Sequence, residues 1–158
     1  MTIGIFGYDF HHYKTNAIIK DTFINGFSIG AVFLAPKINY ISNGNIGSID
    51  NDSKNDEIRE FCKVNNINFY RIKHNDNSLI KMIIDSNNID VGLIGGAKII
   101  HQSVIKLFKS GIINYHPGRI PETSGLDSLY RTIENFVPPC VTAHLIDQKI
   151  DAGFFINE

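Results

Sequence analysis

Short apolar runs alternate along the chain with longer stretches that carry one apolar face. The runs predict buried strands, at TIGIFGYD, SIGAVFLAP, INFYRI, DVGLIGG, GIINYHP and CVTAHLID. The stretches between them predict helices, over residues 15–25, 56–65, 78–85, 101–109 and 126–134. Because strands that alternate with helices indicate βαβ units, we expect a Rossmann-like α/β fold. Its sheet should be mainly parallel, with right-handed crossovers and helices on both faces.

One segment, from Lys37 to Asn55, interrupts this alternation. It consists mostly of Asn, Ser, Gly, Asp and Ile, which favours a loop within a domain over a boundary between domains. A chain of 158 residues has the length of one domain with one core. We therefore expect a single domain over residues 1–158.

The composition limits the kinds of molecule that this protein is expected to bind. A net charge of −1 provides no general attraction to nucleic acid or to an anionic membrane. No apolar run approaches the length of a bilayer span, and Asp9 and Lys14 interrupt the N-terminal segment where a signal peptide would be apolar. Cys62 and Cys140 are too far apart to suggest a disulfide framework or a zinc site. We expect a cytoplasmic protein that binds neither nucleic acid nor membrane.

Candidate site residues follow several of the predicted strands. Ligands of open α/β sheets bind beyond the carboxyl ends of the strands. Gly7, the Gly95–Gly96 pair and His116 all come at such ends, and the residues up to Asp151 can fold back towards them. No Gly-x-Gly-x-x-Gly sequence follows the first strand, which disfavours a module that binds NAD.

The strand GIINYHP ends in an unusual pair of polar residues. Asn114 and His116 are two positions apart, so in a strand their side chains share a face. Pro117 biases His116 towards an extended backbone. A single His at a strand end is more often a surface or hydrogen-bonded residue than a catalyst, and the nearby prolines could only punctuate a loop. The later stretch VTAHLIDQKIDAG, with a second His and an Asp before a glycine, favours an active site.

These two stretches together resemble a known family. NYHPGRIPETSGLDSLYRTI, followed by VTAHLIDQKIDAG, is similar to the folate-dependent formyltransferases. Those enzymes have an Asn-x-His-Pro strand end, a Leu/Ile-Pro-x-x-x-Gly loop and a later His-x-x-x-x-x-x-Asp-x-Gly stretch. The similarity extends over most of the chain, and DVGLIGGAKII occupies the place of the family's folate-pocket strand. The resemblance implies transfer of a formyl group from 10-formyltetrahydrofolate to a primary amine, without a metal.

The resemblance also implies catalytic roles for Asn114, His116 and Asp151. Attack on the formyl carbon creates an oxyanion, which Asn114 and His116 can stabilise as hydrogen-bond donors. Asp151, or a water that it holds, can carry a proton from the amine to the departing folate nitrogen. We expect His144 to pack beside the site and to orient Asp151 or the loop backbone, and Thr123 to brace the proline loop.

Two binding regions follow from the same resemblance. The folate pocket would take one wall from the glycine-rich segment and the other from the loop before Asp151. Its residues are Ile94, Gly95, Gly96, Ala97, Lys98, Ile99, Ile100, Ile146 and Asp147. On its own, a Gly-Gly pair more often only turns the chain. The acceptor would lie beside residues that can meet a diphosphate, namely His11, His12, Lys14 and Arg119.

Sequence features that are missing from this chain limit the choice of acceptor. Purine-pathway members have a Gly-x-Gly-Ser-Asn-like phosphate loop where this chain has GYDFHHYKTN, and members that formylate initiator tRNA have a further C-terminal domain and a basic surface. We therefore expect a nucleotide-linked amino sugar as acceptor. Glycinamide ribonucleotide, methionyl-tRNA, or a binding remnant without turnover stay open as alternatives.

The C-terminal end differs from the family pattern. Family catalytic domains continue past the Asp loop into further strands and a helix, whereas this sequence ends at Glu158. The resemblance thus implies either a truncated catalytic domain or a small member that completes itself by association. Phe154, Phe155 and Ile156 lack an obvious cover, so we expect a homo-oligomer or a chain of low stability.

Overall fold

The computed structural model describes residues 1–39, 48–49, 54–125, 127–148 and 153–157. Its main sheet has seven strands in the order β5-β2-β1-β6-β7-β8-β9. Their bounds are β1 Thr2–Tyr8, β2 Ser28–Ala35, β5 Phe69–Arg71, β6 Val91–Ile94, β7 Ile112–His116, β8 Thr142–Leu145 and β9 Phe154–Asn157. Strand pairs from β5 to β7 are parallel, whereas β7–β8 and β8–β9 are antiparallel. The expected Rossmann-like, mainly parallel fold is confirmed.

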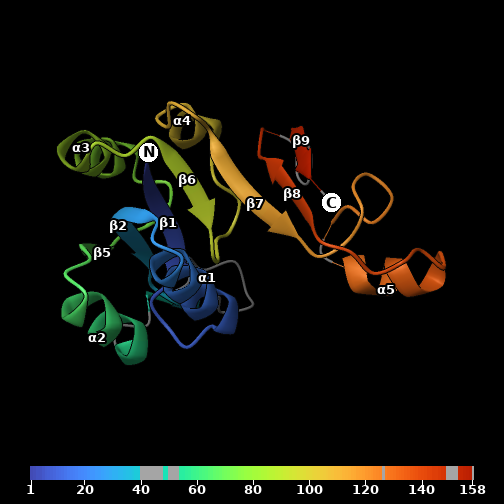
Figure 1. Ribbon diagram of the computed structural model, residues 1–158, viewed down its shortest axis with the longest axis horizontal. Helices are drawn as coiled ribbons and strands as arrows, with labels where there is room; N and C mark the ends of the chain where they lie inside the picture. The colour runs from blue at the N-terminus through green and yellow to red at the C-terminus, as the bar shows by residue number, and fades with distance from the viewer. Residues whose placement is uncertain (40–47, 50–53, 126, 149–152, 158) are drawn as a thin grey trace.

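Helices cover the two faces of the parallel half of the sheet (Figure 1). They are α1 Tyr13–Ile24, α2 Asp56–Val64, α3 Asn77–Asn87, α4 Gln102–Ile105 and α5 Ser128–Glu134. Helices α1 and α2 pack on one face, and α3 and α4 on the other. Helix α5 lies beyond the edge of the sheet, away from either layer (Figure 1). It is therefore not the crossover of a βαβ unit, and β8 returns antiparallel to β7.

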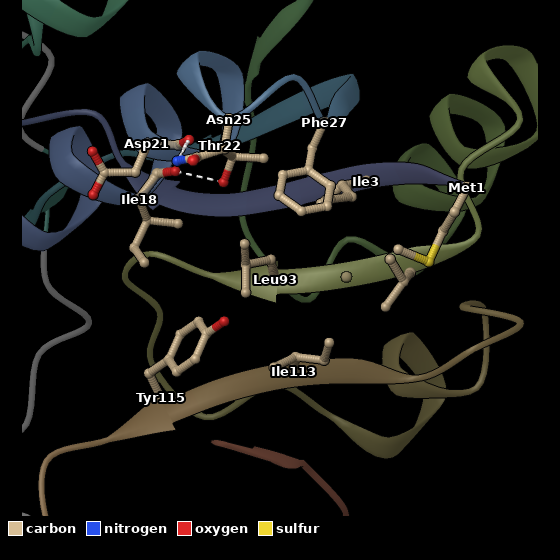
Figure 2. Close-up of a pocket in the computed structure, with 12 residues that line it drawn as sticks. Met1, Ile3, Ile18, Asp21, Thr22, Asn25, Phe27, Leu93, Ile113 and Tyr115 are labelled. Atoms are coloured by element: carbon tan, nitrogen blue, oxygen red, sulfur yellow. Dashed lines mark hydrogen bonds between the residues drawn. The ribbon is translucent and has the colours of Figure 1, made fainter. Parts of the chain in front are cut away.

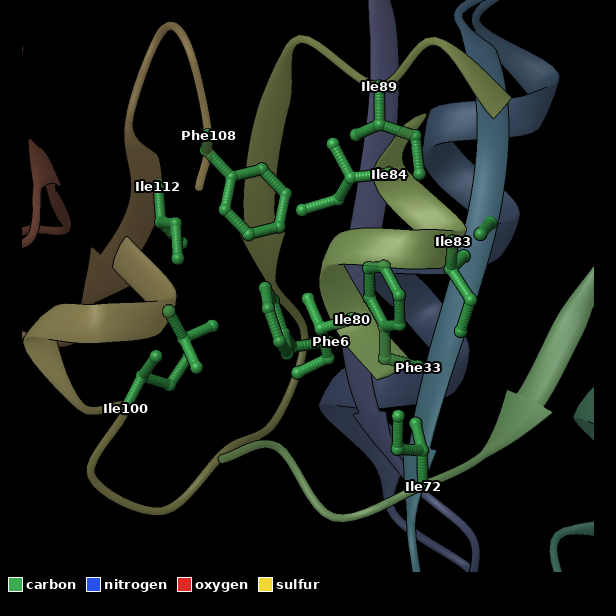
Figure 3. Close-up of a cluster of buried hydrophobic side chains, with 12 residues drawn as sticks. Phe6, Phe33, Ile72, Ile80, Ile83, Ile84, Ile89, Ile100, Phe108 and Ile112 are labelled. Atoms are coloured by element: carbon green, nitrogen blue, oxygen red, sulfur yellow. The ribbon is translucent and has the colours of Figure 1, made fainter. Parts of the chain in front are cut away.

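Alternation along the strands creates one apolar cluster on each face. Phe6 of β1 and Phe33 of β2 point to the α3/α4 face, where their ring centroids are 5.0 Å apart and Phe108 lies 5.6 Å from Phe6 (Figure 3). Ile5 points to the α1/α2 face and packs in a second cluster with Ile19 of α1. Apolar residues that are buried on both sides explain why these strands are continuous apolar runs.

The buried side chains change character along the chain. Among the described residues, every apolar side chain of the core lies at or before Ile112. After that position, the buried side chains are all polar: His116, Thr123, Ser128, Thr132, Thr142 and His144. The last part of the sheet is therefore held by hydrogen bonds more than by apolar packing.

An open apolar groove lies on the α1/α2 face, between α1 and β7 (Figure 2). Its volume is about 380 Å³, and Ile3, Leu93, Ile113 and Tyr115 line it together with residues of α1. Tyr115 points to this face, so its neighbours in β7 at 114 and 116 point to the opposite one. The groove is thus separated by the sheet from the Asn–His pair.

Two local expectations differ from the structure. Helix α4 is shorter than the predicted stretch 101–109, because hydrogen bonds of the 3₁₀ type follow it and turn Phe108 into the core. Within the predicted loop 37–55, β3 Ile38–Asn39 and β4 Ser48–Ile49 form a short antiparallel pair; 40–47 and 50–53 lie outside the described residues. In the described parts of the chain, the helices are too short or too polar to cross a bilayer.

Candidate active site

The Asn114–His144 contact is the centre of the site. Asn114 is paired with His144 across β7 and β8, and His116 with Thr142, so all four share a face of the sheet. The Asn114 Nδ2 lies 3.3 Å from the His144 Nε2, where the amide N–H donates and the ring nitrogen accepts. His144 therefore orients Asn114, and its expected contact with Asp151 stays a prediction. Asp151, the third predicted catalytic residue, lies outside the described residues.

The ring of His116 is fixed by the loop that follows β7. It is 3% exposed, and its Nε2–H donates to the Thr123 carbonyl at 3.0 Å. The Thr123 hydroxyl and backbone N–H both donate to the Arg119 carbonyl at 2.8 Å, so Thr123 braces the proline loop as expected. The Thr142 hydroxyl donates to the Gly118 carbonyl at 2.6 Å and ties the same loop to β8.

The two predicted walls of the folate pocket meet on the same face as Asn114. Ile94, Ala97 and Ile146 pack against the apolar cluster that contains Ile100 and Ile112. The backbone N–H of Ile146 donates to the Ile112 carbonyl at 2.9 Å. An apolar cluster therefore borders the polar Asn–His pair along β7.

The position of this second wall corrects the expected convergence at the carboxyl edge. Because β8 is antiparallel, Ile146 and Asp147 lie towards the amino end of β7, and the segments meet along a face of the sheet. Ile99 does not join them, since its side chain is 66% exposed. Lys98 and Asp147 are exposed as well.

The Gly95–Gly96 turn packs directly against the loop that follows β1. Both backbone N–H groups donate to the Phe6 carbonyl, at 2.9 and 3.0 Å. A Cβ at position 96 would lie 2.8 Å from atoms of Tyr8 and Thr15 and 3.0 Å from His12, distances that real Cβ atoms rarely show. Glycine is therefore required for the close approach of the two loops, beyond the ordinary need for a turn.

The predicted acceptor residues have local partners. His12 is the N-cap of α1, where its Nδ1 accepts from the Thr15 backbone N–H at 3.2 Å. Burial, with smaller effects from Lys14 and His11, lowers the pKa of His12, so its ring is neutral at pH 7. The Lys14 Nζ donates to the Tyr115 carbonyl at 2.9 Å, between Asn114 and His116 in the sequence. Lys14 thus joins this loop to the end of β7.

The other two predicted acceptor residues differ in exposure. His11 is exposed, and Arg119 is half-buried in the proline loop. Their role in binding stays a prediction.

Sequence analysis did not identify two buried polar residues, Asp9 after β1 and His74 after β5. Asp9 was considered only as a charge that interrupts the N-terminal apolar run, but it is fully buried between Arg59 and Arg71. His74 is also buried, and its Nε2 lies 2.9 Å from the Phe33 carbonyl. These partners are at least 41 residues away along the chain, so no local pattern could have indicated them.

The site offers hydrogen-bond donors. Asn114 has two amide N–H groups, one of which remains after the contact with His144, whereas the Nε2–H of His116 donates to the Thr123 carbonyl. Such donors are suited to a developing oxyanion. Within the described residues, no group of three His, Cys, Asp or Glu side chains is placed to hold a metal ion.

The comparisons with known proteins find sequence relatives, among them a formyltransferase. Over 132 residues the chain is 31% identical to methionyl-tRNA formyltransferase of Mycoplasma genitalium, which covers 82% of this chain. The chain spans 39% of the length of that relative. No family model matches the sequence.

Solved structures share the fold over 99% of this chain. They include glycinamide ribonucleotide transformylase 1 of Symbiobacterium toebii (TM-score 0.71, 16% identity, 71% of that chain). Phosphoribosylglycinamide formyltransferase of Streptococcus pneumoniae has a TM-score of 0.68 (18% identity, 79% of that chain). A formyltetrahydrofolate deformylase of Pseudomonas syringae has a TM-score of 0.69 (14% identity, 49% of that chain). The chain therefore has the fold of the formyltransferase catalytic domain, and its sequence similarity also supports the formyltransferase family.

Proposed function

We propose that this chain transfers a formyl group from 10-formyltetrahydrofolate to a primary amine. The observation that carries the proposal is the position of Asn114, oriented by His144 and adjacent to His116 on β7, beside the apolar cluster at Ile100 and Ile146. A polar donor pair that borders an apolar surface suits a ligand with a polar reacting group and a flat ring system. The resemblance of the motifs and the names of the comparison proteins agree with this chemistry.

In the proposed reaction the amine nitrogen attacks the formyl carbon of the donor. The carbonyl oxygen becomes an oxyanion, towards which the remaining N–H of Asn114 and an imidazolium at His116 donate. The bond between the formyl carbon and N10 of the folate then breaks. The proton lost by the attacking nitrogen is carried to N10 by Asp151 or by a water that it holds. No covalent enzyme intermediate is needed because the amine is the nucleophile.

The folate would lie along the α3/α4 face. The apolar side chains of Ile94, Ile100 and Ile146 provide contact surface for its rings. Gly95 and Gly96 pack against Tyr8 and use their N–H groups on the Phe6 carbonyl, so they would shape the end of this wall while the apolar side chains contact the rings. We propose 10-formyltetrahydrofolate as a co-substrate on these grounds and on the resemblance.

For the acceptor we propose a nucleotide-linked amino sugar. The loop after β1 has no glycine cradle, and it carries His11, His12 and Lys14, of which Lys14 contacts the end of β7. One observation favours a second candidate, methionyl-tRNA, since the sequence relative has that specificity in its name. Glycinamide ribonucleotide is a third candidate because the structural neighbours are named for it.

The decisive experiment is an acceptor panel. The protein is incubated with 10-formyltetrahydrofolate and, separately, with nucleotide-linked amino sugars, glycinamide ribonucleotide and methionyl-tRNA, while release of tetrahydrofolate is followed. Turnover with any amine supports formyl transfer, and the amine that reacts identifies the acceptor. Binding of folate without turnover across the panel would instead indicate a remnant that has lost activity.

Three variants test the assigned roles in the same assay. Replacing His116 with Ala, Asn114 with Ala or Asp151 with Asn should lower turnover by about 10²–10⁴-fold, the usual range for oxyanion and acid–base groups. His101→Gln, at an exposed position, is the matched control and should retain normal turnover. Near-normal activity of the His116 or Asn114 variant would show that the mechanism is wrong.

A fourth variant tests the acceptor region. Lys14→Ala, alone or with His12→Ala, should weaken binding of the acceptor and leave folate affinity unchanged in calorimetric titration. Unaltered acceptor affinity in the double variant would move the acceptor site to Arg119 and its neighbours.

A further inference from the structure

Residues 8–14, which connect β1 to the start of α1, form the acceptor loop. A buried carboxylate between two guanidinium groups lies at the start of this loop, on its α2/β5 side. Asp9 is the first residue after β1, and none of its surface is exposed. Its Oδ1 accepts from the Arg59 Nε at 2.8 Å, and its Oδ2 accepts from the Arg59 Nη2 at 2.5 Å and from the Arg71 Nε at 2.7 Å. The pair with Arg59 is therefore bidentate, a geometry that fixes direction as well as distance.

This network joins three elements that are remote in the sequence. Arg59 belongs to α2 and Arg71 is the last residue of β5, whereas Asp9 begins the loop to α1. The backbone N–H of Asp9 donates to the Ala35 carbonyl at 2.8 Å and extends the pairing of β1 with β2 by one residue. The carboxylate thus holds the loop exactly where it leaves the sheet.

A second contact from α2 holds the same loop further on. The Asn55 side chain, which caps α2, donates to the Phe10 carbonyl at 3.1 Å and to the Asn16 Oδ1 at 2.7 Å. On the opposite side, the loop carries His12 against Gly96 and Lys14 against the Tyr115 carbonyl. The rear of the loop is therefore fixed by α2 and β5, and its front contacts Gly96 and the end of β7.

A gain in the free energy of unfolding is not enough to explain this network. Removing a carboxylate and parts of two guanidinium groups from water carries a desolvation cost that their attraction offsets only with good geometry. In some proteins, buried ionic groups of this kind specify one conformation.

We propose that Asp9, with Arg59 and Arg71, is a positioning residue that sets the conformation of residues 8–14 and so determines affinity for the amine acceptor. The kinetic part of this inference rests on the proposed function. Asp9 acts through the loop and does not touch either substrate. Binding of folate, whose wall is formed by β6, β7 and the residues after β8, should not depend on it.

The test uses Arg71→Gln, which leaves the bidentate Asp9–Arg59 pair in place and should fold, together with Asp9→Asn. Amide hydrogen exchange should accelerate by about tenfold or more over residues 8–16, the change expected for loss of one hydrogen bond to a charged group, and stay unchanged in β6. The KM for the acceptor should rise by a similar factor, with the KM for 10-formyltetrahydrofolate and kcat within about twofold of the wild type. Arg71→Lys, which keeps the charge, should recover part of the effect.

A matched control is Lys81→Gln, which removes an exposed ion pair with Asp85 on α3 and should change none of these quantities. Unchanged exchange over residues 8–16 in both Arg71→Gln and Asp9→Asn would overturn the proposal, as would an equal rise of both KM values. If the wild-type protein turns over no acceptor, the proposed function fails, and the exchange measurement alone decides whether Asp9 positions the loop.

Discussion

The protonation of His74 should make the stability of this protein depend on pH. His74 lies between β5 and α3 with its Nε2 2.9 Å from the Phe33 carbonyl, and the ring meets the edge of Phe6 at 5.1 Å. Burial lowers its pKa from 6.5 to about 4, and the nearby backbone carbonyls of Phe33 and Gly7, which favour the protonated ring, offset part of that effect. The unfolded chain therefore binds a proton near pH 6.5 that the folded protein excludes until about pH 4.

The sign and size of the effect follow from this difference. Because the unfolded state binds more protons in this window, the contribution of His74 to stability is present above pH 6.5 and is lost as the pH falls towards about 4. The pKa difference of roughly 2.5 units corresponds to about 3 kcal/mol over the whole window, at 1.36 kcal/mol per unit. Between pH 7 and pH 5 the loss should be about 2 kcal/mol.

Urea unfolding at pH 7 and pH 5 measures this loss. The wild-type protein should lose about 2 kcal/mol more of its free energy of unfolding between the two pH values than His74→Gln, which cannot titrate. His101→Gln removes an exposed imidazole and should behave like the wild type. Equal losses in the wild type and in His74→Gln would refute the assignment of a buried neutral imidazole at this position.

Three further outcomes are expected. Gly96→Ala should lower the free energy of unfolding by about 1–3 kcal/mol in thermal melts because its Cβ meets atoms 2.8 Å away, and Gly95→Ala, with contacts of 3.3 Å, should cost less. Burial raises the pKa of Cys62 to about 11, so mass spectrometry should find Cys140 alkylated at pH 8 well before Cys62. The exposed edge strand β9 should promote self-association, and Phe155→Lys should reduce it in sedimentation velocity; a monodisperse wild-type monomer at high concentration would contradict this.

The local pattern of apolar and polar residues was sufficient to predict the parallel half of the sheet. The strands β1, β2 and β6 are continuous apolar runs, and their buried environment on two faces explains why such runs predict them. The shared face of Asn114 and His116 follows from strand periodicity in the same way.

Other features depend on contacts that no short stretch of sequence contains. The apolar and polar residues of β8 are the same for either strand direction, so its antiparallel pairing, and with it the position of Ile146, could not be inferred from them. The helix α5 before β8 suggested a crossover, but it lies outside the layers of the sheet. The contact between Asp9 and Arg71 joins residues 62 positions apart, and it is visible only when the fold is known.

The polar character of the buried side chains after Ile112 has a consequence for how the molecule opens. Groups such as Thr142 and His144 exchange protein hydrogen bonds for water when they separate, and little apolar surface is exposed in the process. The segment from β8 onward should therefore behave as a separate foldon, with a smaller opening free energy than the apolar half. Since Asn114 is oriented from that foldon while Ile100 belongs to the apolar half, the site spans the boundary between them. On warming, the two halves of the site should come apart while most of the sheet is still folded, so that inactivation precedes global melting.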